Sequence, residues 1–167
     1  MRLDAPLPTS FTPGMAQDYM MRLVQQIALM LAAIMAKRKL GKKAEAQQDL
    51  ASLCPLIVGL SLDTVKQLSP DALANQLISS GVDHASRAVM LADLLLEDGE
   101  ILEDQGQLQQ ALPSYIHAFC LLSDAMPALT QEEHDLYRPK LDHVSTKLAH
   151  LPPNPYTSER LRAHTAG

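Results

Sequence analysis

An unbroken run of ten apolar residues, IALMLAAIMA from Ile27 to Ala36, limits what this chain of 167 residues can fold into. A helix that spans a membrane needs about 20 such residues, so the run is too short to cross a bilayer. As a helix the run is apolar on every side, and a helix of that kind must be covered by other parts of a protein. We therefore expect a compact helical domain without a transmembrane segment.

The remaining composition favours helices as well. Apolar volume comes mainly from Leu and from eight Met, whereas the chain has two Phe and no Trp. Leu, Met, Ala and Gln are good helix formers. No stretch alternates apolar and polar residues for long enough to indicate a strand. The expected fold class is therefore all-α, in a single compact domain.

Proline, glycine and capping residues divide the chain into helices. They are expected at about 15–40, 43–58, 63–68, 70–79, 85–105, 108–126 and 131–150. Pro55, Pro113 and Pro139 fall inside three of them, where proline favours a kink or an end. The sequence thus predicts a disordered arm over 1–14, a helical domain over 15–151 and an irregular tail over 152–167.

Small and large residues recur at fixed intervals in the second half of the chain. The spacings are 3, 4, 5, 4 and 3 between Gly99, Leu102, Gly106, Ala111, Tyr115 and Ala118. This pattern resembles the tetratricopeptide repeat, in which small residues let two antiparallel helices pack closely. Gly41, Ala46, Leu50 and Leu53 repeat its second half, whereas the helix before them departs from it. We expect antiparallel helical hairpins of this type, with one repeat-like hairpin at 92–125.

Three segments also resemble an uncharacterised family of bacterial tetratricopeptide-like proteins. They are DYMMRLVQQIALMLAAIMAKR from Asp18, GLSLDTVKQLSPDAL from Gly59 and LLLEDGEILEDQGQLQQAL from Leu94. The resemblance covers roughly residues 16–150. It implies a fold but no activity, cofactor or functional residue.

Charge and cysteine content narrow the function classes. The formal net charge of −5 opposes binding to nucleic acid. Cys54 and Cys120 have apolar neighbours and form neither a disulfide framework nor a metal motif, which is typical of reduced thiols in the cytoplasm. The six histidines lack the spacing of a zinc site, and no nucleophile or phosphate-binding motif is present. We expect no cofactor, no metal and no enzymatic activity.

Two charged clusters are candidate surfaces. Asp93, Glu97, Glu100 and Asp104 lie 4, 3 and 4 residues apart and form one acidic stripe on a helix. The stripe is a candidate interaction surface for a basic peptide, although a solvated helix face has the same pattern. Basic residues at 37–43 suit either an anionic partner or the carboxyl end of a helix.

The apolar helix itself suggests self-association. Its methionines offer an adaptable surface. Met20, Met30, Ile34 and Met35 are the candidate residues for a homodimer interface, and complete burial within one copy is the alternative.

The sequence thus favours a non-enzymatic interaction or scaffold module with an unknown protein partner. A helical ligand-binding domain is the second hypothesis, and peripheral membrane contact is a third that is not expected. A deep pocket between the hairpins would favour a small ligand, whereas a broad groove would favour a protein.

Overall fold

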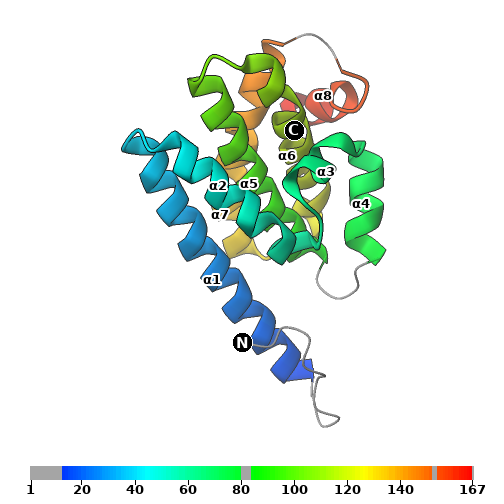
Figure 1. The fold of residues 1–167 in the computed structure, drawn as a ribbon. Helices are drawn as coiled ribbons and strands as arrows, with labels where there is room; N and C mark the ends of the chain where they lie inside the picture. The colour runs from blue at the N-terminus through cyan, green and yellow to red at the C-terminus, as the bar shows by residue number, and fades with distance from the viewer. Residues whose placement is uncertain (1–12, 80–83, 152–153, 167) are drawn as a thin grey trace.

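The computed structural model describes residues 13–79, 84–151 and 154–166, and this part of the chain is helical without a strand (Figure 1). The all-α prediction is confirmed. The elements are α1 (Pro13–Lys39), α2 (Lys43–Val58), α3 (Leu62–Gln67), α4 (Pro70–Ser79), α5 (His84–Asp104), α6 (Leu108–Ala125), a short 3₁₀ turn η1 (Met126–Ala128), α7 (Gln131–Ala149) and α8 (Ser158–Ala166). The predicted arm at 1–14 lies outside the described residues except for its last two, which belong to α1.

The prolines within helices do not interrupt them. α2, α6 and α7 each continue through their proline, although the sequence favours a break or bend at Pro113 and Pro139. Pro139 is exposed, and so is Asp135, whose carbonyl loses its partner because proline has no N–H. Water can solvate that carbonyl on the outer side of the helix, so the cost of the missing hydrogen bond is small.

The prediction of an irregular carboxyl-terminal tail is wrong, because residues 158–166 form α8. This helix lacks an apolar stripe and is held by contacts with distant residues. Both Nε and Nη2 of Arg160 lie 3.0 Å from the Asp124 carboxylate on α6. His164 lies 2.8 Å from Asp142 on α7. Tertiary contacts of this kind leave no periodic signal in the sequence.

α5 and α6 form the antiparallel hairpin at the centre of the molecule and share the most extensive contact of the helix pairs. Gly106 makes the turn with a φ of 75°, a conformation that glycine adopts without strain. Gly99 packs directly on the ring of Tyr115, and a Cβ at position 99 would lie 2.5 Å from its Cε1. The close approach that the spacing predicts at this pair is therefore present.

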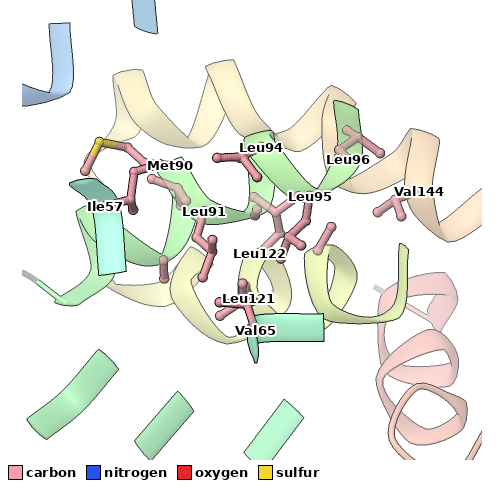
Figure 2. Close-up of a cluster of buried hydrophobic side chains, with 14 of the residues drawn as sticks. Ile57, Val65, Met90, Leu91, Leu94, Leu95, Leu96, Leu121, Leu122 and Val144 are labelled. Atoms are coloured by element: carbon pink, nitrogen blue, oxygen red, sulfur yellow. The ribbon is translucent and has the colours of Figure 1, made fainter. Parts of the chain in front are cut away.

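The core surrounds this hairpin. Figure 2 shows buried side chains contributed by α2, α3, α5, α6 and α7, from Ile57 to Val144. Of the short helices, α3 contacts α2 and α6, and α4 packs on α5 and α6. Two polar contacts fasten the α3 region to the central hairpin: Lys66 lies 2.8 Å from the buried Asp98, and His117 Nε2 donates to the Leu68 carbonyl at 2.7 Å. The hairpin of α1 and α2 and the hairpin of α5 and α6 thus share one core.

Candidate interaction surface

The acidic stripe of α5 is paired with cations from α1 and α7. Lys140 Nζ lies 2.6 Å from Asp93, and Arg38 donates from Nε and Nη2 to Glu97 at 2.8 and 3.3 Å. The same guanidinium lies 3.5 Å from Asp104. A basic peptide would therefore have to displace cations that the chain already supplies.

The third carboxylate of the stripe, Glu100, lies between two groups of α7. His143 Nε2 is 2.6 Å from Glu100 Oε1, and Lys147 Nζ is 3.6 Å from Oε2. Lys147 also lies 2.7 Å from Glu103, which accepts a hydrogen bond from the Tyr115 hydroxyl at 2.5 Å. These contacts connect α7 to the central hairpin along one edge.

The stripe is only partly solvated, in contrast to an ordinary exposed helix face. Glu97 is 6% exposed, and the side chain of Asp93 is 18% exposed. Burial raises the pKa of the Asp93 carboxyl, and the neighbouring Lys140 opposes this shift. The hydrogen bond to Glu97 raises the pKa of the Arg38 guanidinium. Because a buried carboxylate without a partner is costly, the ion pairs with Arg38 and Lys140 offset the cost of burying Glu97 and Asp93.

A groove of about 410 Å³ runs over this stripe, between α1 and α7. Its floor consists of Asp93, Glu97 and Glu100 of the stripe, together with Leu96 of α5. One wall is α1, which contributes Ala28, Leu31, Ala32 and Met35. The other wall is α7, which contributes Leu136 and Tyr137 beside Lys140 and His143. Leu136 is 58% exposed, so the groove combines apolar walls with a floor of paired charges.

The four candidate residues for self-association lie in different surroundings. Met30 is 41% exposed, whereas Ile34 is 3% exposed and belongs to the core of the single copy. Met35 is partly buried and lines the groove. Met20 lies in α1, but its side chain is outside the described part of the structure. Of the three candidates whose side chains are described, Met30 alone is thus open on the surface.

The basic residues at 37–43 are divided between internal contacts and solvent. Lys37 lies 2.5 Å from Asp49 of α2, and Arg38 holds Glu97. Lys43 lies 3.5 Å from the Asp104 carbonyl. Lys39 and Lys42 are exposed. Most of this cluster therefore joins α1 and α2 to each other and to α5.

The described residues offer no arrangement for metal or thiol chemistry. Among them, no group of three or more His, Cys, Asp or Glu side chains is close enough to hold an ion. Cys54 and Cys120 are free and buried. Burial raises the pKa of the Cys54 thiol to about 12 and that of Cys120 to about 11, which keeps both protonated. A protonated thiol is a poor nucleophile.

The sequence does not identify several of the residues that line the groove or pair with the stripe. Lys140, His143 and Lys147 of α7 are spaced 3 and 4 apart, which matches the spacing of the stripe on α5. This match indicates pairing only if the two helices lie side by side, which a single sequence does not state. Leu136 has no such signal, because an exposed leucine on a mainly polar helix is common.

Comparisons with protein-family models, with curated proteins and with solved structures find no match to the chain. The resemblance to a bacterial tetratricopeptide-like family therefore remains a prediction. Within residues 13–79, 84–151 and 154–166, no helix has both the length and the apolar character needed to cross a bilayer.

Proposed function

We propose that the protein is a non-enzymatic interaction or scaffold module that holds an amphipathic helix of a partner protein in the groove between α1 and α7. The observation that carries this proposal is the pair of apolar walls on either side of the stripe. Ala28 and Ala32 are small and exposed on one wall, and Leu136 is exposed on the other. Helices commonly dock in such grooves through apolar residues on one face.

The proposal includes a tetratricopeptide-like arrangement of the hairpins. The contact between Gly99 and Tyr115, the glycine turns at Gly41 and Gly106, and the fully buried Ala111 and Ala118 support it. In arrays of this kind the first helix of each hairpin lines the concave surface. α1, α5 and α7 have that place in the chain order, and they line the groove. The two reduced, buried thiols support a cytoplasmic location.

The occupant of the groove is expected to be mainly apolar on the side that faces α5. The charges of the floor are already paired with each other, so a charged partner would gain little from them. Burial of Leu136 and of the α1 wall would supply the favourable free energy, at about 25 cal/mol for each Å² of apolar surface. Self-association through α1 is a separate part of the proposed function.

Affinity purification from the native host tests the groove. We expect a partner to be recovered with the wild-type protein and lost with Leu136→Glu, which places a charge on the apolar wall. Leu40→Glu is the matched control, because Leu40 is 75% exposed and lies outside the groove. Equal recovery with both variants, or no partner with the wild-type protein, would contradict the proposed role of the groove.

A second candidate function is the binding of a small apolar ligand between α4 and α6. A cleft of about 180 Å³ is lined there by Leu73, Leu77, Ala88, Cys120 and Leu121, among others. Ligand pockets usually have about 300–1,000 Å³, and an apolar cavity of about 150 Å³ holds a molecule the size of benzene. The cleft is thus small, and the wider groove favours a protein partner. Saturable, stoichiometric binding of an alcohol such as hexanol, abolished by Ala88→Phe, would favour the ligand instead.

A further inference from the structure

We propose that the outer face of α1 binds the same face of a second copy, with the two helices antiparallel. The outer face consists of Leu29, Met30, Ala33 and Ala36, and all four are exposed. This inference rests on the self-association part of the proposed function and leaves the groove over the stripe free. It differs from the four methionine and isoleucine candidates of the sequence, because Ile34 is buried within one copy.

α1 uses only one side to pack against its own chain. Ile27, Leu31 and Ile34 are at most 5% exposed and follow one another at helical spacing. Since the sequence from Ile27 to Ala36 has no polar side chain, the side that faces away from the core is apolar too. Leu29 is 73% exposed at the centre of that side. The single copy therefore does not cover the helix all round.

The apolar surface continues beyond α1. Leu56 of α2 is 45% exposed, and a cleft of about 260 Å³ between the two helices is lined by Met30, Ala33 and Leu56, with Asp49 and Ser52 as its polar residues. Contiguous apolar surface of this kind marks an interaction site more often than single exposed residues do.

The first part of α1 also projects away from the remaining helices (Figure 1). Asp18, Tyr19, Met21 and Arg22 in this part are all exposed. A helical segment of about ten residues without tertiary contacts is only marginally stable in water. Packing along a second copy of α1 would support the projecting parts of both helices.

The charges of α1 select the antiparallel arrangement. Asp18 near its amino end and Lys39 at its carboxyl end are exposed, and neither forms an ion pair with the described residues. Antiparallel packing centred near Leu29 places Asp18 of each copy beside Lys39 of the other and also opposes the helix dipoles. Parallel packing would bring like charges together. An interface between two equal copies must be complementary to itself, and an apolar face lined with alanine meets this requirement.

The size of the face indicates a weak dimer. Contact along the whole of α1 sets the upper limit: a helix of 27 residues is about 40 Å long, and a strip about 10 Å wide gives about 400 Å² on each copy. The total of about 800 Å² is below the range of about 1,200–2,000 Å² for stable complexes. The dimer is therefore expected to form at high protein concentration and to dissociate on dilution.

Sedimentation equilibrium over a wide concentration range tests the dimer. The mass of the wild-type protein is expected to rise from one copy towards two. Leu29→Glu is expected to raise the dissociation constant by about tenfold or more, since a carboxylate would be buried at the centre of the interface. Ile78→Glu is the control, because Ile78 is 59% exposed on α4 and lies outside this face. Circular dichroism and urea unfolding of each variant, at concentrations where it is monomeric, verify that both variants fold.

Cysteine cross-linking tests the orientation. Mild oxidation is expected to join two copies of Leu29→Cys by a disulfide and to leave Lys39→Cys monomeric. A disulfide needs Cα atoms about 6 Å apart, and antiparallel packing centred near Leu29 brings only position 29 of the two copies together. The native Cys54 and Cys120 are buried and do not interfere. Equal linking at both positions would refute the antiparallel arrangement.

A wild-type monomer at every concentration, or a dimer unaffected by Leu29→Glu, would refute the dimer. Co-sedimentation of a monomeric protein with anionic vesicles, lost in Leu29→Glu, would assign this face to lipid and also refute it. The proposal for the groove would stand in each of these cases, because it is tested separately, by the recovery of a partner with Leu136→Glu.

Discussion

Replacing Gly99 with alanine perturbs the closest approach between α5 and α6. A Cβ at position 99 would lie 2.5 Å from Cε1, 2.8 Å from Cδ1 and 2.9 Å from Cζ of Tyr115. Contacts this short cannot persist, so the ring or the helix has to move. Tyr115 is fully buried, and its hydroxyl donates to Glu103 at 2.5 Å, which restricts any movement of the ring.

Three contributions determine the expected change in the free energy of unfolding. Alanine in place of glycine stabilises a helix interior by about 1 kcal/mol. Overpacking of a core costs about 1–3 kcal/mol. Movement of the ring weakens its hydrogen bond to Glu103, which costs about 1 kcal/mol more. We therefore expect Gly99→Ala to destabilise the protein by about 1–3 kcal/mol, and each kcal/mol lowers the melting temperature by about 2–4 °C at this chain length.

Urea unfolding followed by circular dichroism measures this change, with Tyr115→Leu as the background for a double-mutant cycle. Once the ring is absent, Gly99→Ala is expected to be neutral or to stabilise by up to about 1 kcal/mol. An equal effect of Gly99→Ala in both backgrounds would refute the steric argument. So would a stabilised single variant.

Two further predictions concern polar groups in the core. Arg38→Met is expected to destabilise the protein by about 3 kcal/mol in urea unfolding, because it leaves the buried Glu97 carboxylate without its partner. The double variant Arg38→Met with Glu97→Leu is expected to regain most of that stability. A double variant as unstable as Arg38→Met would contradict this. Burial lowers the pKa of His117, whereas an unfolded histidine has a pKa of about 6.5. The unfolded chain therefore binds a proton first as the pH falls, so this contribution to stability is complete above about pH 6.5 and declines below it. His117→Gln keeps a donor for the Leu68 carbonyl. In this variant the urea midpoint is expected to change less with pH in that range. A pH profile identical to that of the wild type would rule out this assignment.

Local signals in the sequence predict most helices but not their polar contacts. Glycines with positive φ end α1, α2 and α5 close to the expected positions, and Thr130 with Glu133 forms the expected capping box at the start of α7. These features act within a few residues, so a single sequence contains them. α8 was missed because its helix depends on Asp124 and Asp142, which are distant in the chain.

The surface was harder to predict than the helices. The stripe on α5 was identified from its spacing, but the spacing could not reveal that Glu97 is buried or that Arg38 and Lys140 neutralise it. Whether a charged helix face is solvated depends on which helix lies opposite. The apolar run of α1 likewise predicts coverage on all sides, whereas the structure leaves Leu29 open. The sequence shows that the helix is apolar on every side, but it does not show whether the same copy or another molecule covers each side.

α8 closes one end of the helical stack. It lies against α6 and α7, and its outward residues, Glu159, Arg162 and Thr165, are polar and exposed. Polar terminal units of this kind prevent a helical array from adding further units. The outer face of α1, at the other end, is apolar. In the proposed dimer the copies join through this end alone, so they would form a finite pair and not a filament.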